Sequence, residues 1–402
     1  MSRLLFWAAS ALIGFTYVGF PVLVALRARL APRPHAKADI TPAVSVIIAA
    51  HEEVGHIGRR VDNLLAQDYP ADRLEIVVAS DGSTDGTAAA ARRDDPRVVV
   101  LDLPRVGKAE ALNAAVGRST GEILVLSDAN TSFAPDAIRA LVRSFADPAV
   151  GGVAGNQVYL PRGSDPATAG DAVGVGESSY WDLDRRVKLD ESLGGNVISA
   201  TGAIYALRRE LFRPVPDGVT DDFVTSTRVV AQGRRLVFEP DARAFEPVAP
   251  SSRQEYRRKV RIMTRGLRGV VVARELLDPR RFGFYAVQLA THKVLRRLMA
   301  IPLVVIALTS PRLWSGGALY RLATLGQVAV YGLGALGIAL RERSIGRNRL
   351  LALPAFFVLV NVAALHALAN LVTGRRIARW QPDRAPAPAT GDDPAGTERP
   401  AA

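Results

Sequence analysis

Carboxylate side chains follow short apolar runs at several points of this 402-residue chain, and the first such place is residues 80–87, SDGSTDGT. Asp81 can accept hydrogen bonds from a nucleobase or a ribose, and the glycines let the backbone come close to a ligand. Backbone N–H groups at the start of the following helix favour negative charge nearby. A turn in which Thr84 or Asp85 caps that helix explains the same residues. A calcium loop is excluded, because its twelfth position holds Arg92 instead of a bidentate glutamate.

Two oxygen-bearing side chains stand two residues apart in Asp128-Ala129-Asn130. On an extended segment, side chains two positions apart project the same way, so Asp128 and Asn130 suit an Mg²⁺ or Mn²⁺ ion that bridges a diphosphate. An Asx-turn before the next helix explains this segment equally well.

A pair of carboxylates, Asp221 and Asp222, follows Thr220 ahead of a helical stretch. Neighbouring carboxylates repel each other, so one of them keeps a raised pKa, which is the condition for a general base that works near neutral pH. Helix capping is the alternative role.

Basic side chains offer the opposite charge in two places. Residues 257–261 hold four of them, including Arg258 and Arg261, and these can grip a leaving diphosphate or the anionic headgroups of a membrane. Lys108 opens a helix after Gly107, where a single lysine taken alone is more often solvated than functional.

These side chains need a scaffold, and the chain supplies alternating strands and helices between residues 40 and 280. Short apolar runs without alternation are typical of parallel strands buried on both faces. They are residues 44–50, 74–80, 98–103 and 123–127. The expected helices are residues 54–66, 84–93, 108–116 and 135–145. The pattern predicts an α/β fold with a doubly wound, mostly parallel sheet, whose ligands bind at the carboxyl ends of the strands.

Several functions are excluded by composition and motif spacing. The chain has no cysteine, so it has no disulfide, no thiolate metal site and no cysteine nucleophile. No G-x-G-x-x-G motif follows a predicted strand, which argues against a dinucleotide-binding dehydrogenase. HEEVGH at residues 51–56 places its second histidine one residue too late for a zinc protease.

The charge balance indicates an anionic partner. The chain carries 51 Lys and Arg against 39 Asp and Glu, a net charge of +12. A nucleic acid, a membrane surface or a phosphate-bearing substrate would each suit that excess. We expect no nucleic-acid partner, because many arginines flank apolar segments and no strand interleaves aromatic and basic residues.

Long apolar segments predict a membrane protein. Residues 4–26 carry no charge and, at about 1.5 Å per residue, reach about 34 Å, enough to cross a bilayer. Arginines follow this segment, so we expect an uncleaved anchor whose end lies in the cytoplasm. Further segments are residues 298–308, 322–340 and 350–372, with an interfacial helix over residues 282–294 before them. Four crossings would leave Arg375, Arg376 and Arg379 outside, against the positive-inside tendency.

The expected organisation therefore has four parts. Residues 1–30 form a transmembrane anchor, residues 40–280 a cytoplasmic catalytic domain, residues 282–375 an interfacial helix with C-terminal transmembrane helices, and residues 381–402 a disordered tail.

Taken in order, these motifs resemble the membrane-bound glycosyltransferase family 2, which includes cellulose, chitin, hyaluronan and poly-N-acetylglucosamine synthases. The resemblance covers residues 42–270 and the membrane layout, and it implies a GT-A fold. It implies that Asp222 is the catalytic base beside Asp221, and that Asp128 is the metal ligand. The positions that it assigns to substrate are Ala50, Glu53, Asp81, Lys108, Asn130, Gly202, Arg258 and Arg261. Among these, Asp81 resembles the uridine-binding aspartate of the family, and Gly202 lies in its acceptor-side segment.

This chain departs from the family pattern at three motifs. Glu52 replaces an asparagine, and Asn130 replaces the second carboxylate of Asp-x-Asp, which leaves Asp128 as the main metal ligand. Arg258 and Ile262 replace the glutamine and the tryptophan of Gln-x-x-Arg-Trp, the motif that holds a growing chain in processive synthases. These substitutions put processive synthesis in doubt.

The resemblance implies inverting transfer from a nucleoside diphosphate sugar, in particular a UDP-sugar, to a saccharide or a lipid, with Mg²⁺ or Mn²⁺ as cofactor. The product would be a cell-surface polysaccharide or a glycolipid, and a single transfer to a polyprenyl phosphate is a further reading. We expect the plasma membrane of a bacterium as location, and an oligomer or an accessory subunit as partner. The alternative is a catalytically silent membrane sensor of nucleotide sugars or headgroups with the same fold.

Overall fold

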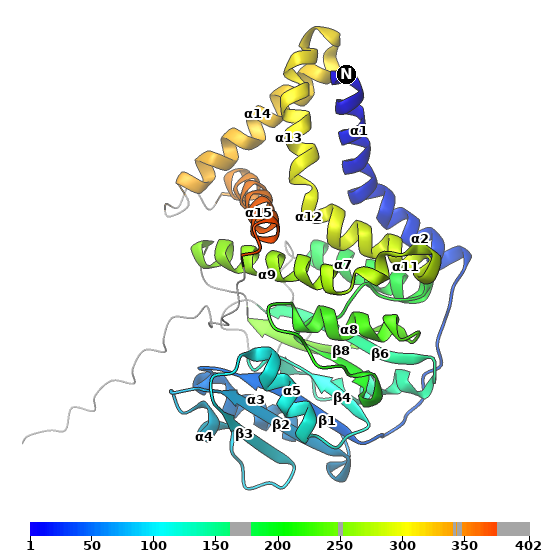
Figure 1. Ribbon diagram of the computed structural model, residues 1–402, viewed down its shortest axis with the longest axis vertical. Helices are drawn as coiled ribbons and strands as arrows, with labels where there is room; N and C mark the ends of the chain where they lie inside the picture. Colours follow the sequence, from blue (N-terminus) through cyan, green and yellow to red (C-terminus); the bar gives the residue numbers. More distant parts are fainter. Residues whose placement is uncertain (161–177, 248–251, 341–342, 344–347, 376–402) are drawn as a thin grey trace, which may run out of the picture.

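Apolar helices stand on one side of an α/β domain in the computed structural model of the protein (Figure 1). The structure describes residues 1–160, 178–247, 252–340, 343 and 348–375. The tail expected from residue 381 lies outside the described residues.

Eight strands form one sheet in the order β3-β2-β1-β4-β7-β6-β8-β5. They are β1 (Val44–Ala50), β2 (Leu74–Asp81), β3 (Val98–Leu103), β4 (Ile123–Leu126), β5 (Ser132–Phe133), β6 (Val150–Leu160), β7 (Tyr205–Arg208) and β8 (Arg235–Pro247). β1 pairs in parallel with β2 and β4, and β2 pairs in parallel with β3, which confirms the four predicted strands. β7 and β5 run antiparallel to their neighbours, so six of these eight strands point the same way.

Helices cover both faces of this sheet, as predicted for a doubly wound fold. They are α3 (Val54–Leu65), α4 (Thr87–Ala91), α5 (Lys108–Arg118), α6 (Ala137–Val142), α7 (Ser178–Gly194) and α8 (Asp221–Ala231), with 3₁₀ turns η2 (Ala71–Arg73), η3 (Arg143–Ala146) and η4 (Arg209–Leu211). All seven residues of β1 are buried. Val46 and Ile48 pack on one face with α3, whereas Ile47 and Ala49 pack on the other with α5. Because successive strand residues point to opposite faces, an unbroken apolar run is what this sheet requires.

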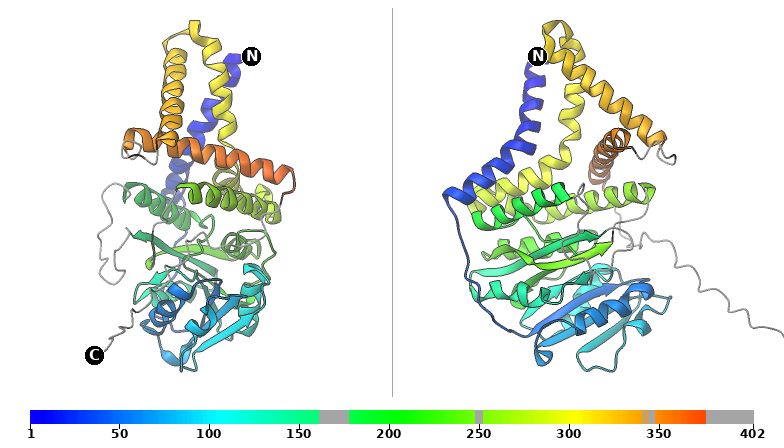
Figure 2. Two further views of the ribbon diagram at one scale, coloured as in Figure 1. Left: turned by 90° about the vertical axis from the view of Figure 1, so that its left-hand side faces the viewer. Right: turned by 180° about the vertical axis from the view of Figure 1, so that it is seen from behind.

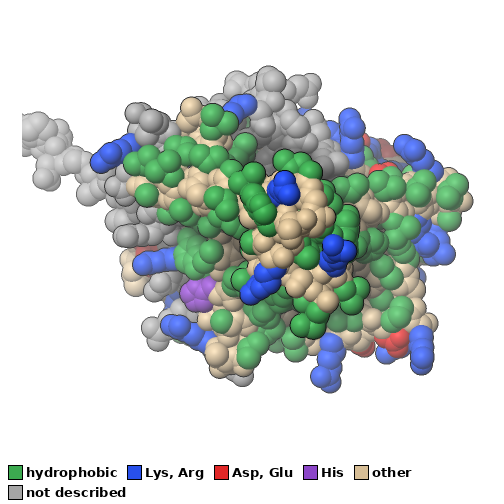
Figure 3. Space-filling model, turned by 90° about the horizontal axis from the view of Figure 1, so that it is seen from above, with side chains coloured by type: hydrophobic (Ala, Val, Ile, Leu, Met, Phe, Trp, Pro, Cys, Tyr) green, Lys and Arg blue, Asp and Glu red, His purple; other side chains and the backbone are tan. Residues whose placement is uncertain are grey.

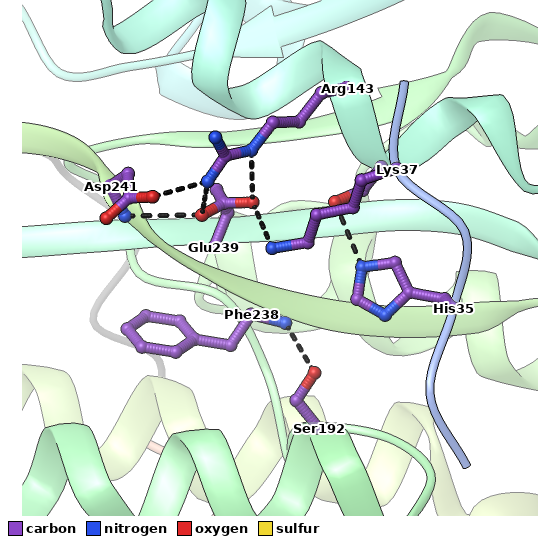
Figure 4. Close-up of polar contacts among 8 residues, drawn as sticks. His35, Lys37, Arg143, Ser192, Phe238, Glu239 and Asp241 are labelled. Carbon is purple, nitrogen blue, oxygen red and sulfur yellow. Dashed lines mark hydrogen bonds and ion pairs between the residues drawn. The ribbon is translucent and has the colours of Figure 1, made fainter. Parts of the chain in front are cut away.

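The segment that leads into β1, residues 31–43, is fastened to the domain by ion pairs (Figure 4). The carboxylate of Glu239 is fully buried and accepts from Lys37 Nζ at 2.8 Å and from Arg143 Nη2 at 2.7 Å. His35 lies 3.1 Å from the hydroxyl of Ser144. A buried carboxylate is tolerated only when it is paired, so this contact fixes the path of the segment along the sheet.

The apolar helices form a layer of their own beside the α/β domain (Figure 1). They are α1 (Ser2–Gly14), the π-turn η1 (Phe15–Gly19), α2 (Phe20–Leu30), α13 (Ala300–Thr309), the 3₁₀ turn η7 (Pro311–Gly316), α14 (Ala318–Ala339) and α15 (Arg349–Val372). Within the described residues, three stretches are long and apolar enough to cross a membrane: Ser2–Leu30, Ala318–Ala339 and Arg349–Val372. The fourth expected segment forms the shorter apolar helix Ala300–Thr309.

A set of helices separates the apolar layer from the sheet (Figure 1). They are α9 (Ser252–Val272), the 3₁₀ turn η5 (Arg274–Leu277), α10 (Pro279–Phe282), α11 (Phe284–Leu289), the π-turn η6 (Ala290–Leu295) and α12 (Arg296–Leu298). From above, the apolar layer shows mostly hydrophobic side chains, with many of the Lys and Arg side chains around its margin and few acidic ones (Figure 3). Such a surface suits lipid with anionic headgroups at its edge.

Candidate active site

The carboxyl ends of β2, β1 and β4 lie next to one another, because these strands are neighbours in the sheet. Asp81 ends β2, Ala50 ends β1, and Asp128 follows β4 by two residues. Strand order thus brings together segments that are far apart in the sequence, as expected for a ligand site at this edge.

Lys108 connects two of the predicted carboxylates. Its Nζ lies 2.9 Å from Asp128 Oδ1 and 3.2 Å from Asp221 Oδ2. The lysine side chain is only 20% exposed. Burial lowers its pKa, but the charges of Asp128 and Asp221 outweigh burial and raise the pKa well above the usual range. Lys108 therefore stays charged, and it joins the end of β4 to the start of α8.

Asp222 has the environment of a base that works near neutral pH. Burial and then the adjacent charge of Asp221 raise the pKa of Asp222 to about 7, although Lys108 and Lys293 oppose this shift. Its Oδ1 accepts the backbone N–H of Phe223 at 2.7 Å. The pKa asymmetry predicted from paired carboxylates is present, and it falls on the second member of the pair.

Asp81 shapes the loop that delivers Lys108. Its side chain is fully buried, and Oδ1 accepts the backbone N–H groups of Val106 at 2.7 Å and Gly107 at 2.8 Å. Oδ2 pairs with Arg105 at 3.0 Å. Gly82 adopts φ +59° and packs against the backbone of Arg105. A Cβ on Gly82 would lie 2.7 Å from the backbone nitrogen of Arg105. Since these contacts are made within the chain, contact of Asp81 with a nucleoside stays a prediction.

The residues after β1 contact the loop after β2. Glu52 adopts φ +54°, a left-handed conformation that asparagine takes more readily than glutamate. This turn lets the backbone N–H of Glu53 donate to Thr87 Oγ1 at 2.8 Å and that of Val54 donate to Asp85 Oδ2 at 3.1 Å. Asp85 Oδ1 also accepts the backbone N–H of Thr87, the first residue of α4, at 3.0 Å, although the N-cap residue of α4 is Gly86. Glu53 is buried beside the edge of the sheet.

Gly202 gives Asp128 the room that it needs. The backbone N–H of Asp128 donates to the Gly202 carbonyl at 3.1 Å. A Cβ at position 202 would lie 2.8 Å from Asp128 Oδ2. Only glycine fits here without moving the carboxylate, so the predicted acceptor-side segment also positions Asp128.

A second polar group lies beside Asp128 and contains Asn130 and Arg258. The Asn130 amide nitrogen donates to Glu246 Oε1 at 3.2 Å, which leaves the amide oxygen as its remaining ligand atom. Burial and the charge of Asp128 raise the pKa of Glu246, whereas Asn130 and Arg258 lower it. Burial and Glu246 also raise the pKa of Tyr159 to about 12, and Arg258 acts against this shift. Asn130 and Arg258 thus share one neighbourhood with Asp128.

Two basic residues that the motifs do not mark face the carboxylates. Arg265 lies one turn after Arg261 on α9. Burial and the charge of Arg261 lower the pKa of Arg265, whereas Asp221 raises it. The charge of the predicted Arg261 thus lowers the pKa of Arg265, and the charge of Asp221 acts against this shift.

Lys293 of η6 lies close to Asp222. Its Nζ lies 5.3 Å from the centre of the Phe223 ring. Burial and Arg297 lower the pKa of Lys293 to about 8, and Asp222 raises it. The only signal of Lys293 in the sequence is that charged residues interrupt an otherwise apolar segment.

The oxygen atoms near Asp128 fit a divalent cation that shares its coordination with a substrate. Within the described residues, no three His, Asp or Glu side chains come together as a group that could hold a metal ion. Mg²⁺ in nucleotide enzymes is held by one or two carboxylates plus phosphate oxygens. The carboxylate of Asp128 and the amide oxygen of Asn130 match that smaller donor set.

Comparison with known proteins agrees with this geometry. Residues 45–215 match the family "Glycosyl transferase family 2". An N-acetylglucosaminyltransferase of Rhizobium sp. (strain N33) is 27% identical over 290 residues, which cover 67% of this chain and 63% of that protein. A poly-beta-1,6-N-acetyl-D-glucosamine synthase of Staphylococcus aureus (strain MSSA476) is 25% identical over 244 residues, covering 59% of this chain and 57% of that protein. The chain thus spans about three fifths of the length of these curated relatives.

A solved structure shares the fold over nearly the whole chain. The mannosyltransferase PcManGT from Pyrobaculum calidifontis, in complex with GDP-Man and Mn²⁺, superposes with a TM-score of 0.67 at 26% identity. The superposition covers 92% of this chain and 100% of that one. The mixed sheet with its covering helices is therefore of the GT-A type, as predicted.

Proposed function

Because the chain carries a glycosyltransferase family 2 domain, we propose that it transfers a sugar, with inversion, from a nucleoside diphosphate sugar to a saccharide or lipid acceptor. The observation that carries this proposal is the contact of Lys108 with both Asp128 and Asp221, beside Asp222. The ammonium group of Lys108 thus links Asp128, on the side expected to bind the donor, to Asp221, which precedes the proposed base.

Asp222 is the general base in this proposal. It takes the proton of an acceptor hydroxyl, whose oxygen attacks the anomeric carbon from the side opposite the diphosphate. A carbon–oxygen bond to the acceptor forms as the bond to the diphosphate breaks, so the configuration inverts. With a pKa of about 7, Asp222 is ionised often enough near neutral pH to accept this proton, and basic enough to hold it.

The charge that develops on the diphosphate needs cationic partners. Arg258, Arg261 and Arg265 lie on α9 and are the side chains that we assign to this role. A bound Mg²⁺ or Mn²⁺, held by Asp128 and Asn130, would supply further positive charge there. The Mn²⁺ of the mannosyltransferase complex supports a divalent cation at this position.

We propose a UDP-sugar as donor, with its nucleoside near Ala50, Glu53 and Asp81. These residues end β1, follow it, and end β2, respectively, and the diphosphate would then extend towards Asp128. The relatives named as N-acetylglucosaminyltransferase and poly-N-acetylglucosamine synthase favour UDP-N-acetylglucosamine as the first donor to test. The GDP-Man of the structural neighbour makes GDP-mannose the necessary comparison.

The long apolar helices support a location in the bacterial plasma membrane. We assign residues 1–30 to an anchor, residues 40–280 to a cytoplasmic catalytic domain and residues 282–375 to the membrane-proximal helices. The product would be a cell-surface polysaccharide or a glycolipid, made with or without an accessory subunit.

A donor screen with the detergent-solubilised full chain tests this function. Release of UDP or GDP is measured for common UDP-sugars and for GDP-mannose, each with Mg²⁺, with Mn²⁺ and with EDTA. We expect turnover with one donor, dependence on the metal, and no transfer by Asp222→Asn although that variant still binds UDP. Asp72→Asn is the matched control, since its carboxylate is 82% exposed.

Product size then separates the acceptor classes. A ladder of products indicates a polysaccharide, whereas a single shift in mobility indicates transfer of one sugar. Nucleotide binding without any release or transfer would refute the enzymatic proposal and favour the silent sensor.

A further inference from the structure

Helix α15 is apolar enough to cross a membrane, yet its C-terminal half lies against α9. Tyr256 on α9 contacts His366 on α15, with Oη and Nδ1 3.1 Å apart. Farther along both helices, the Asn370 amide nitrogen lies 3.4 Å from Thr264 Oγ1. Beyond the end of α15, Arg268 Nη2 donates to the Gly374 carbonyl at 3.1 Å. The contacts occur in the same order along both helices, so this part of α15 runs alongside α9 in the same direction.

This contact constrains α15 because α9 cannot enter the hydrocarbon core. From residue 257 onwards, the basic side chains of α9 are Arg257, Arg258, Lys259, Arg261, Arg265 and Arg268. A charged side chain at the centre of a bilayer is strongly unfavourable. From Tyr256 to Arg268, α9 extends about 18 Å, and α15 follows it for most of that length. The part of α15 that is held to α9 therefore stays at the level of α9.

The N-terminal half of α15 is held by α14. Gly334 of α14 lies so close that a Cβ there would come within 2.9 Å of the Pro354 carbonyl. A Cβ on Gly337 would come within 2.5 Å of the Leu351 carbonyl. Figure 2 shows α14 descending towards the α/β domain, and α15 crossing above that domain instead of rising beside α13. Both ends of α15 thus lie on the domain side of the apolar layer.

The opposite end of the apolar layer holds the N-terminus and the turn between α13 and α14 (Figure 1). The Trp7 indole N–H donates to the Tyr320 hydroxyl at 3.3 Å, and the rings of Phe6 and Tyr320 lie 5.0 Å apart. These contacts join the beginning of α1 to the beginning of α14, far from α15.

We propose that α15 does not span the membrane: it lies in the membrane plane on α9, and its C-terminal end remains on the same side as the catalytic domain. Its partner is the lipid of that leaflet, which takes up the apolar face that points away from α9. Leu353 (68% exposed) and Leu365 (41%) are among its exposed apolar side chains, whereas Phe356 lies beside Lys259 of α9. The polar residues His366 and Asn370 lie on the opposite side and contact α9.

This arrangement removes the conflict that four crossings create. The chain then crosses with α1–α2, returns with α12–α13 and crosses back with α14. Arg375 then lies on the same side as the arginines that follow α2 and as Arg343 and Arg349, which follow α14. All of these arginines then obey the positive-inside tendency together.

Thiol labelling in intact cells tests the side on which α15 ends, and the absence of cysteine from the chain gives every variant a single thiol. Ala71→Cys reports the catalytic domain, Ser315→Cys reports the turn before α14, and Thr373→Cys reports the end of α15. A membrane-impermeant maleimide should label Thr373→Cys only under the conditions that label Ala71→Cys. Labelling of Thr373→Cys together with Ser315→Cys overturns the proposal, as does labelling of all three on one side.

Depth measurement distinguishes a helix in the plane from a crossing one without relying on sidedness. Spin labels at Leu353→Cys and Leu365→Cys are 12 residues apart, so a crossing helix would separate them by up to about 18 Å in depth. We expect their depths to agree to within about one helical turn, roughly 5 Å. The matched control is α14, where Leu325→Cys and Leu336→Cys should differ by most of about 16 Å. Equal separations in α14 and α15 would refute the arrangement, whatever the enzyme transfers.

Discussion

Replacing Asp221 by asparagine should shift the pH dependence of transfer to lower pH. After burial, the charge of Asp221 is the largest cause that raises the pKa of Asp222 to about 7. Removal of that charge lowers the pKa of Asp222, so the base is ionised at lower pH. Lys108→Met should act in the opposite direction, because Lys108 stabilises the ionised form of Asp222.

The size of the effect follows from the fraction of ionised Asp222. With a pKa of about 7, that fraction is about 0.09 at pH 6 and about 0.9 at pH 8, a ratio of about ten. At the ordinary pKa of 3.8 the ratio would be about one. Asp221→Asn should therefore give a ratio between about one and ten, and Lys108→Met a ratio between about ten and one hundred.

The assay is kcat/KM for nucleotide release from pH 5.5 to 9, at saturating metal. Ratios between two pH values are compared, so a loss of absolute rate in a variant does not obscure the shift. Asp72→Asn should reproduce the wild-type profile, and Asp222→Asn should lose about 10²- to 10⁴-fold at pH 8, where the wild-type base is mostly ionised, and less at lower pH. A flat wild-type profile between pH 6 and pH 8, or more than a tenth of the activity left in Asp222→Asn, would refute the assignment of the base.

Four further changes test the site and the packing of the fold. Gly202→Ala should displace the Asp128 carboxylate, 2.8 Å from the new Cβ, and weaken metal-dependent nucleotide binding at least tenfold by calorimetry; Asp128→Ala should do the same, and equal affinities with and without Mn²⁺ would contradict this. Burial raises the pKa of Glu191 from 4.5 to about 7, so the folded state holds its proton more tightly and stability falls as pH rises between these values, by up to about 3 kcal/mol. Asp222 contributes a fall over the same range, so thermal melts of Glu191→Gln should show a smaller fall than the wild type, whereas an unchanged slope would exclude Glu191 as a source. Glu239→Gln should cost about 1–2 kcal/mol in a denaturant melt, because it removes the charge that pairs with Lys37 and Arg143 and leaves Arg143 only the exposed Asp241, and a loss below about 0.5 kcal/mol would contradict the role of the fastening.

The parallel half of the fold was predictable because its strands carry their own signal. β1, β2 and β4 are short apolar runs that are almost entirely buried, and β3 is a half-buried apolar run at the edge of the sheet; a parallel sheet uses such runs without alternation. The other half gives weaker signals. β5 has two residues and β7 has four, and β6 contains Gly151, Gly152 and Gly155. A Cβ on Gly151 would come within 2.5 Å of Leu211, so these glycines serve close packing, which no periodicity reveals.

The carboxylates of the site were predictable for a different reason. A parallel sheet brings the ends of its strands together, so Asp128 and the segment after β2 had to be neighbours once the strands were placed. That Lys108 contacts Asp128 and Asp221 could not be derived this way, because it depends on how the loop held by Asp81 directs α5. Local sequence treats such a lysine as solvated, and only the fold shows that it is mostly buried.

The proposed base also depends on a residue outside the predicted catalytic domain. Residues 40–280 contain all the predicted carboxylates, but Lys293, whose charge lowers the pKa of Asp222, lies beyond them in η6. Arg265 approaches Asp221 from α9, the helix that also carries α15. The proposed base therefore lies between a sheet and helices that contact the apolar layer, and its acidity depends on both. Loss of the Lys293 charge alone, with the covering helices in place, would raise the pKa of Asp222, because one opposing cation is gone.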